Sequence, residues 1–364
     1  MRAALYNARM SEKGKKVIVA MSGGVDSAVA GSRLIDSGYD VTGVFMCLGT
    51  AGGVDTASRG CCSPADAADA RLVANMLGIE LFVLDLSDAF APLIADFAAE
   101  YAAGRTPNPC IHCNTLIKFG RLLERADSLG VDYIATGHYA RITEFEGQRA
   151  ICRAAAGGKD QSYALFGIPR NVLGRILLPV GEIADKQAVR RIAQELDLVV
   201  HDKPDSQEIC FAPDDDYVAI LESMAPAALR PGDIIDSSGA VLGRHKGYGR
   251  FTIGQRRGLR VAAGVPMYVT KIDPVAATVT IGPRDEVMSR HLTASGANWH
   301  ADVSGEFSAM VQIRYNHSGQ AASVKLTGDD TFAVEFVEPV SAITPGQAVV
   351  VYDGQRMLGG GWID

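Results

Sequence analysis

Short apolar runs alternate with helical patterns along the first half of the chain. Strand-like runs separated by helices are typical of a doubly wound α/β domain with a parallel sheet, in which ligands bind beyond the carboxyl ends of the strands. The pattern therefore predicts such a domain in this half. Its strand-like runs are residues 17–21, 41–46, 81–84 and 132–136. One of its two clearest helical patterns begins after Asp26, and the other covers about residues 65–77.

The pattern changes from about Pro231 to short strands separated by turns that contain glycine and proline. This texture predicts an all-β barrel or a pair of small β modules. At 364 residues the chain is also longer than one core usually supports, so two or three domains are expected. The strand-like runs of this part are residues 267–272, 278–281, 310–314, 322–326, 332–336 and 348–352.

The composition indicates a globular protein with no role in a membrane. Hydrophobic residues make up 48% of the chain and charged residues 21%, and no apolar stretch approaches the length that spans a bilayer. The first sixteen residues contain no apolar core of signal-peptide length, so we expect a flexible lead-in and a cytoplasmic location. Without an export signal, the seven cysteines favour redox, sulfur or metal chemistry over a disulfide framework.

The first strand-like run leads directly into residues 22–27 (SGGVDS). Two glycines let the backbone come close to an anion, two serines add hydroxyl groups, and the helix that follows points its unpaired N–H groups at the same place. The loop matches neither the Walker A spacing nor G-x-G-x-x-G. It resembles the phosphate loop of the ATP pyrophosphatases, which adenylate a substrate oxygen and release pyrophosphate. The alternative is an ordinary strand–turn–helix corner.

Two cysteines, Cys110 and Cys113, follow a segment with two prolines. The prolines bar a helix before Cys110, so these cysteines are predicted on a loop that enters the next helix, where thiolates are favoured. A C-x-x-C pair serves redox disulfides, zinc and iron–sulfur clusters alike. Zinc needs two more ligands, and the adjacent Cys61 and Cys62 are geometrically awkward. Cys210 stands alone, which suits a sulfur relay.

Two further cysteines, Cys47 and Cys152, lie beside apolar strand-like segments and are interpreted as inert core residues.

The formal net charge is −7, but the cations are unevenly distributed. Residues 243–260 (GRHKGYGRFTIGQRRGLR) contain six Lys or Arg side chains and no carboxylate, interleaved with His245, Tyr248 and Phe251. Such a strip suits a nucleic-acid phosphate backbone. A solvated loop is the alternative. The cations are Arg244, Lys246, Arg250, Arg256, Arg257 and Arg260.

Together these motifs resemble those of the tRNA-specific 2-thiouridylases, the MnmA/TrmU family, over nearly the whole chain. The resemblance implies an enzyme that binds ATP and Mg²⁺, adenylates the C2 oxygen of the wobble uridine of tRNA, and replaces that oxygen with sulfur from a cysteine persulfide. The matching stretches are residues 21–27 (MSGGVDS), 43–46 (GVFM), 106–119 (TPNPCIHCNTLIKF), 135–141 (ATGHYAR), 159–163 (KDQSY), 205–211 (DSQEICF), 251–258 (FTIGQRRG) and 312–315 (QIRY).

The resemblance also implies domains and partners. Residues 1–14 are expected to be a flexible lead, 15–217 an ATP pyrophosphatase domain, 218–288 a central β-rich tRNA-binding domain and 289–364 a C-terminal β-barrel. The expected partners are tRNAs of the Lys, Glu and Gln types, and a cysteine desulfurase or sulfur-relay protein that supplies the persulfide.

Residue roles follow from the same resemblance. Cys210 matches the persulfide carrier, and Cys113 matches the thiol that can close a disulfide with it. The residues that match ATP contacts are Ala20, Met21, Ser22, Gly23, Gly24, Val25, Asp26, Ser27, Met46 and Gly137. Those that match tRNA contacts are Asn108, Pro109, Cys110, His138, Lys159, Asp160, Gln161, Arg314, Tyr315 and Gln347.

One position departs from the pattern, because some members of the family have an aspartate where this chain has Cys110. A second hypothesis is therefore an iron–sulfur cluster held by Cys110, Cys113 and Cys210, with one iron open to hydrosulfide. Two rival functions remain: a small-molecule adenylating synthetase, and a non-catalytic RNA-binding or iron–sulfur carrier protein. The cysteines and the β-rich half argue against the first, and the intact loop at residues 22–27 argues against the second.

Overall fold

The computed structural model describes residues 13–49, 63–155, 159–204, 209–212 and 217–364. Most of the predicted lead-in, Cys61, Cys62 and the stretch before Ile209 lie outside these ranges. The chain divides into two compact units. Unit 1 comprises Met1–Ala91, Cys110–Asp215 and Gln355–Met357, and unit 2 comprises Pro92–Pro109, Asp216–Gly354 and Leu358–Asp364.

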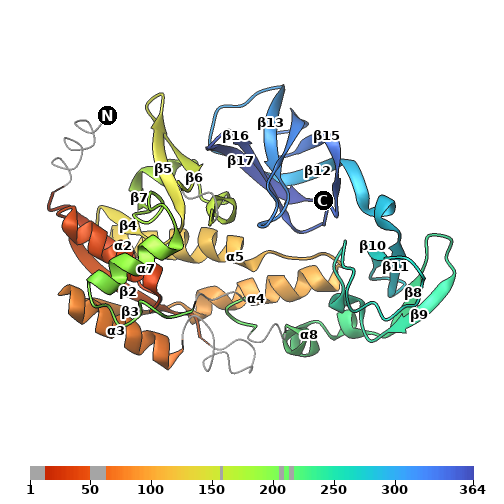
Figure 1. Ribbon diagram of the computed structural model, residues 1–364, viewed down its shortest axis with the longest axis horizontal. Helices are drawn as coiled ribbons and strands as arrows, with labels where there is room; N and C mark the ends of the chain where they lie inside the picture. The colour runs from red at the N-terminus through yellow and green to blue at the C-terminus, as the bar shows by residue number, and fades with distance from the viewer. Residues whose placement is uncertain (1–12, 50–62, 156–158, 205–208, 213–216) are drawn as a thin grey trace. The chain divides into compact units, whose positions relative to one another are not determined.

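A five-stranded sheet, parallel throughout, forms the centre of unit 1 (Figure 1). Its order is β3-β2-β1-β4-β7, so the direction of winding reverses between β1 and β4. This confirms the predicted doubly wound parallel sheet, and it places the ligand crevice beyond the carboxyl end of β1. The strands are β1 (Lys16–Ala20), β2 (Asp40–Cys47), β3 (Leu81–Asp85), β4 (Tyr133–Ala135) and β7 (Ile176–Leu177).

Helices α3 (Pro64–Leu77) and α7 (Lys186–Glu195) of unit 1 each begin at a side-chain cap, from Ser63 and Asp185. In α3 the Ser63 side chain accepts the N–H of Asp66, proline occupies the first position, and Gly78 ends the helix in the left-handed conformation. Helix α2 packs against α3 and α7, and α6 packs against β4. The other two helices are α2 (Val25–Asp36) and α6 (Leu122–Ser128).

The cysteine segment differs from its prediction, because a helix begins at Pro109 and includes Cys110. Proline is tolerated in a first helical turn, where its missing N–H would have no partner within the helix. The short helix α5 (Pro109–His112) continues into a π-helical segment, Cys113–Arg121, which buries Cys113, Asn114, Ile117 and Phe119. Both cysteines are therefore helical rather than on a loop.

Several elements of unit 1 are not evident from the sequence pattern. The hairpin of β5 (Ala140–Phe145) and β6 (Gln148–Arg153) pairs Cys152 with Arg356 of β17 (Arg356–Ile363). Helix α4 (Ser87–Ala102) runs from unit 1 into unit 2 and contains Pro92. Short 3₁₀ segments occupy Ser162–Leu165 and Arg170–Arg175.

Unit 2 contains a four-stranded sheet, ordered β10-β11-β8-β9, and a closed six-stranded barrel, ordered β12-β15-β14-β13-β16-β17 with β12 paired to β17. The predicted β-rich half is confirmed. The elements are α8 (Val218–Met224), β8 (Gly232–Ile235), β9 (Val241–His245), β10 (Tyr268–Asp273), β11 (Thr278–Gly282), β12 (Met288–Trp299), β13 (Glu306–Gln312), β14 (Gln320–Leu326), β15 (Phe332–Ser341) and β16 (Ala348–Asp353), with 3₁₀ segments at Pro226–Leu229, Tyr248–Arg250 and Arg284–Val287.

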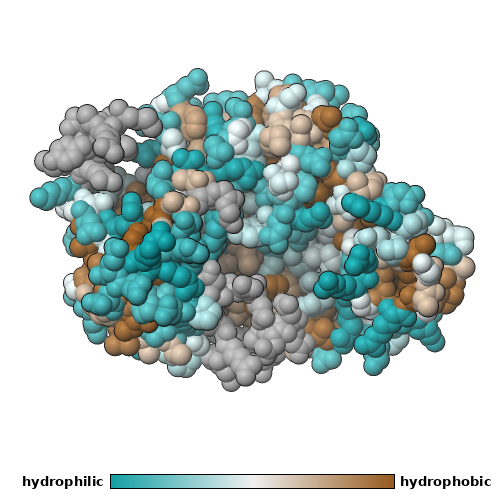
Figure 2. Space-filling model, viewed as in Figure 1, coloured by the Kyte–Doolittle hydropathy of each residue, from teal (hydrophilic) through white to brown (hydrophobic). Residues whose placement is uncertain are grey.

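The surface in the view of Figure 2 is largely hydrophilic, and its hydrophobic residues are scattered. Among the described residues, no helix is both long enough and apolar enough to cross a membrane.

Candidate functional site

The predicted phosphate loop closes on itself at the carboxyl end of β1. The Ser27 hydroxyl accepts the N–H of Ser22 at 3.2 Å and donates to the carbonyl of Gly24 at 2.9 Å. Gly24 is the N-cap of α2 and has no side chain to cap the helix. The first N–H groups of α2 therefore face the loop, in the arrangement that binds phosphate at helix N-termini.

Two glycines let neighbouring backbone segments reach this loop. Gly23 has a φ of +71°, and a Cβ there would lie 2.3 Å from the carbonyl oxygen of Asp66. A Cβ on Gly137 would lie 2.7 Å from the Ser27 nitrogen. A side chain at either position would push α3 or the segment after β4 away from the loop.

Asp26, at the start of α2, is surrounded by cations and a hydroxyl. Its carboxylate accepts a hydrogen bond from the Tyr139 hydroxyl at 2.6 Å and from Lys186 Nζ at 2.6 Å. Lys159 Nζ lies 3.7 Å from its second oxygen. Both ammonium groups also lie over the Tyr139 ring, at 4.8 Å for Lys159 and 5.9 Å for Lys186. One carboxylate therefore faces two positive charges beside the loop.

Lys203 holds the opposite, glycine end of the loop. Its Nζ donates to the Gly23 carbonyl at 2.9 Å and contacts the carboxylates of Asp66 at 2.6 Å and Asp69 at 2.5 Å. Burial alone would lower the pKa of Lys203, but its hydrogen bonds to Asp66 and Asp69 leave the pKa raised. Lys203 therefore connects α3 to the loop through non-covalent contacts.

Two residues matched to tRNA contacts make hydrogen bonds within unit 1. Asp160 accepts from the N–H groups of Ala154 and Ser162 and from the side chains of Arg153 and Ser162. Gln161 exchanges hydrogen bonds with the backbone of Tyr139. The 159–163 motif therefore positions Tyr139 and Lys159 against Asp26.

His138 follows β4 and is half-buried. Burial and, to a lesser degree, the charge of Lys118 hold its pKa well below the ordinary value of 6.5. Its Nδ1 shares a 2.7 Å hydrogen bond with the Thr136 hydroxyl, and its ring lies 5.9 Å from that of Phe119. The imidazole is therefore neutral at physiological pH.

The cysteines of unit 1 differ in exposure. Cys110 is exposed, Cys113 is buried, and Cys210 is half-buried beside Phe211, whose ring packs on Phe90 at 5.6 Å. Within the described part of the chain, no three His, Cys, Asp or Glu side chains are grouped as metal ligands, so the iron–sulfur hypothesis gains no support.

The cysteines that were interpreted as core residues lie at the ends of strands. Cys152 is buried in β6, and burial raises its pKa, as predicted for an inert core thiol. Cys47, at the end of β2, is only half-buried.

In unit 2, the residues matched to tRNA contacts form two groups. Gln347 donates to the carbonyls of Thr106 and Pro107 at 2.9 and 3.1 Å, and so holds the segment that carries Asn108 and Pro109. Gln312 donates to the backbone carbonyls of Arg314 and Tyr315, and the Tyr315 side chain is exposed. The run predicted as strand 310–314 therefore ends at Gln312, because the chain turns there.

The cationic strip at 243–260 combines exposed charges with buried rings. All six of its Lys and Arg residues are exposed, and Arg244 pairs with Asp233 at 3.3 Å. The suggestion that its rings belong to the same binding surface is wrong, because His245, Tyr248 and Phe251 are buried. His245 bonds to the backbone of Ala277, and its ring packs against Phe251. These rings fix the strip to unit 2.

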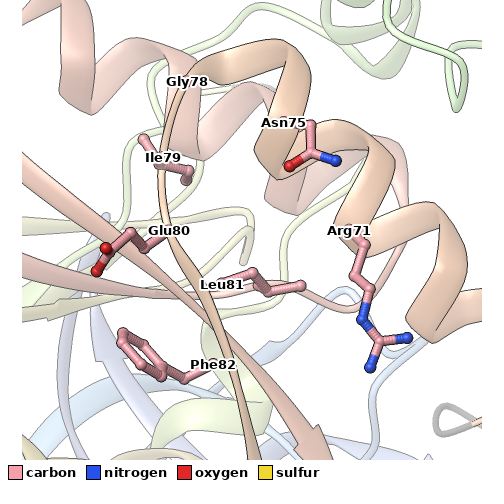
Figure 3. Close-up of a pocket in the computed structure, with 7 residues that line it drawn as sticks. All are labelled: Arg71, Asn75, Gly78, Ile79, Glu80, Leu81 and Phe82. Carbon is pink, nitrogen blue, oxygen red and sulfur yellow. The ribbon is translucent and has the colours of Figure 1, made fainter.

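A depression of about 620 Å³ in unit 1 has a lining that includes none of the loop residues; Figure 3 shows its lining residues. Its lining comes from the later turns of α3 and from residues at the amino end of β3, including Arg71, Asn75 and Glu80. Ligands of parallel sheets bind at the opposite, carboxyl end, so this depression is not the candidate site.

Comparison with known proteins gives the family. The tRNA methyl transferase HUP domain matches residues 15–214, the tRNA methyl transferase PRC-barrel domain residues 219–283, and the aminomethyltransferase beta-barrel domain residues 289–363. The tRNA-specific 2-thiouridylase MnmA of Carboxydothermus hydrogenoformans is 47% identical over 96% of this chain and 98% of its own. That of Lachnoclostridium phytofermentans is 44% identical over 96% and 99%. The chain belongs to the tRNA-specific 2-thiouridylase family.

Solved structures show a weaker likeness to this 2-thiouridylase family member. A 4-thiouridine synthetase in complex with RNA and ATP is 17% identical, with a TM-score of 0.36, over 58% of this chain and 51% of that chain.

The sequence analysis missed three residues that contact the loop, namely Tyr139, Lys186 and Lys203. Tyr139 and Lys203 lie in or beside motifs that characterise the 2-thiouridylase family in this chain, at residues 135–141 and 205–211. Lys186 has no such signal, because it lies 160 positions from Asp26.

Replacing Gly23 with alanine is expected to destabilise the protein by about 2 kcal/mol more than replacing Gly78, because only Gly23 faces a backbone contact. Both have a positive φ, so both variants carry the left-handed penalty of about 1 kcal/mol. Urea unfolding measures the difference, and calorimetry should show ATP binding lost only in Gly23→Ala. Equal destabilisation would contradict the close packing of α3 on the loop.

Acidification is expected to lower the free energy of unfolding partly through His138. Its folded-state pKa is lowered, so its stabilisation is present above pH 6.5 and is lost as the pH falls below that value, where the unfolded chain binds the proton. The free energy of unfolding, measured in urea from pH 7 to pH 5, should therefore decline less steeply in His138→Gln. The variant must be compared with the unaltered protein because His245 and His317 also have lowered pKa values and contribute to the same decline. Identical pH profiles would contradict a neutral His138.

Proposed function

We propose that the protein catalyses ATP-dependent 2-thiolation of the wobble uridine of tRNA. The observation that carries this proposal is the phosphate loop, closed by Ser27 at the carboxyl end of β1, in a chain that shares 47% identity with a tRNA-specific 2-thiouridylase. The uridine O2 attacks the α-phosphate of ATP and pyrophosphate leaves. A poor leaving group, the carbonyl oxygen, thereby becomes part of AMP.

Sulfur then replaces the activated oxygen. The terminal sulfur of a Cys210 persulfide attacks C2, and AMP leaves with the former O2. The Cys113 thiolate next attacks the Cys210 sulfur, which frees the thiolated base and leaves a Cys113–Cys210 disulfide. A two-electron thiol reductant restores both cysteines. Cys210 is half-buried and Cys113 is buried, so in this scheme the carrier is the more accessible thiol of the two.

Residues 20–27, Met46 and Gly137 are proposed to bind ATP. The Asp26 carboxylate is the kind of oxygen donor that Mg²⁺ prefers, and Mg²⁺ on the phosphates would offset their charge. The base must leave the anticodon stack to reach such a crevice. The tRNA is proposed to contact Asn108, Cys110, His138 and the exposed Tyr315, while Gln347 supports Asn108 through the backbone.

The cellular setting is proposed from the resemblance. A cysteine desulfurase or a sulfur-relay protein loads Cys210 in the cytoplasm, and tRNAs of the Lys, Glu and Gln types are the substrates. Methyl transfer, named in the description of the matching domain, is less well supported. A methyl donor of the sulfonium type is a cation, whereas the loop offers N–H groups and lysines that favour an anion.

Cys210→Ser is expected to abolish sulfur transfer to tRNA and to leave ATP binding within about twofold, because the hydroxyl cannot carry a persulfide. Labelled sulfur, followed by nucleoside analysis, measures the transfer, and tRNA-dependent pyrophosphate release measures adenylation. Cys152→Ala is the matched control, since Cys152 is buried in β6. Retained thiolation in Cys210→Ser would reassign the carrier, and pyrophosphate release without tRNA would favour a small-molecule synthetase.

The double variant Arg256→Ala, Arg257→Ala is expected to weaken tRNA binding and to reduce the salt dependence of log K by about 1 to 2 units of slope. Both arginines are exposed. The control, Arg121→Ala with Arg125→Ala, removes the same two charges from an exposed part of unit 1. An unchanged slope in the first variant would return the strip to the role of a solvated loop.

A further inference from the structure

The two ends of the phosphate loop have opposite formal charge. At the Gly23 end, the single ammonium of Lys203 meets two carboxylates, Asp66 and Asp69. At the other end, the single carboxylate of Asp26 meets two ammonium groups, from Lys159 and Lys186. Counting only these described side chains, the first group sums to one negative charge and the second to one positive charge. A polyphosphate is therefore drawn to the Asp26 end, where the N–H groups of α2 also begin.

Lys186 is held at this end by its own helix. It is the first residue of α7, and the side chain of the N-cap residue Asp185 accepts the N–H of Ala188 at 2.6 Å. Val189 and Ala193 of the same helix are buried, and α7 packs against α2. The backbone of Lys186 is thus fixed, while its long side chain spans the gap to Asp26.

The Lys186 side chain is only 18% exposed, so its ammonium needs an anionic partner. Asp26 supplies that partner at 2.6 Å, but the same carboxylate oxygen also accepts the Tyr139 hydroxyl at 2.6 Å. If Lys186 turns to another anion, Asp26 therefore keeps its hydrogen bond from Tyr139 and its ion pair with Lys159, whose Nζ lies 3.7 Å from the second carboxylate oxygen. A phosphate oxygen offers Lys186 a charge-assisted hydrogen bond of at least equal strength.

We propose that Lys186 is a phosphate-binding residue of the ATP site, and that Asp26 occupies its ammonium until the triphosphate displaces the carboxylate. The proposal rests on the proposed function only in that the site binds ATP. Lys186 contacts the β- or γ-phosphate, Lys159 remains with Asp26, and the adenosine portion is bound elsewhere in the crevice. The alternative is a permanent ion pair between Lys186 and Asp26 that only holds α7 against α2.

The test uses the full chain without tRNA and compares the binding of ATP, AMP and adenosine by calorimetry. Lys186→Met should weaken ATP binding by about tenfold or more and leave adenosine within about twofold, because only the phosphates lose a partner. Lys186→Arg keeps the charge and should recover most of the ATP affinity. A purely structural ion pair would instead change all three affinities together, or none, and either result overturns the proposal.

Lys15→Met is the matched control. Lys15 also contacts a tyrosine, with its Nζ 3.2 Å from the Tyr133 hydroxyl and 5.3 Å from the ring centroid. It lies just before β1, however, at the opposite end of the strand from the loop. Its replacement should leave ATP binding unchanged.

Asp26→Asn tests the displacement itself. With divalent cations removed, this variant should bind ATP more tightly than the unaltered protein, because no carboxylate competes with the phosphates for Lys186. Equal or weaker metal-free binding would overturn the displacement. Thermal melting of each variant shows that it is folded. Since tRNA is absent, these outcomes are independent of whether the protein thiolates uridine, and normal ATP binding without tRNA thiolation would reject only the proposed function.

Discussion

The close approach of three backbone segments at the carboxyl end of β1 is the constraint on which the rest of unit 1 depends. Gly23 lies against α3, and Gly137 lies against the first residues of α2, at separations that leave no room for a Cβ. The lysine and tyrosine contacts exist because these segments are so close. Lys203 reaches both the Gly23 carbonyl and α3, and Tyr139 reaches Asp26, only while both glycines allow it.

This packing also creates the electrostatic asymmetry of the loop. Carboxylates accumulate at the end beside α3, and ammonium groups accumulate at the end beside α7. A triphosphate extends over several ångströms and carries its charge along its length, so the asymmetry gives it a direction. Directed binding matters for adenylation, because the attacking uridine oxygen and the departing pyrophosphate must lie on opposite sides of the α-phosphate.

Much of unit 1 could be predicted because its signals are local. The strand-like runs at 17–21, 41–46 and 81–84 correspond to β1, β2 and β3, and the SGGVDS loop is a contiguous motif. Lys186 could not be found this way, since it lies 160 positions from Asp26, the loop residue that it contacts. No periodicity encodes a contact across that separation. The helix at Pro109 was misjudged because a rule about proline in helix interiors was applied to a helix start.

The residues matched to tRNA contacts show why a motif gives a location more readily than a role. Asp160 and Gln161 direct their side chains to neighbouring backbone and arginine groups of unit 1, and Gln347 directs its amide to the Thr106 and Pro107 carbonyls. When both N–H groups of a side-chain amide donate to carbonyls, only the amide oxygen can form a further hydrogen bond with a nucleotide. A residue that holds a loop in place and a residue that contacts RNA look the same in the sequence. Here the hydrogen bonds favour the first for Asp160 and Gln347, whereas at Tyr315 the hydrogen bond from Gln312 goes to the backbone carbonyl and the side chain is exposed.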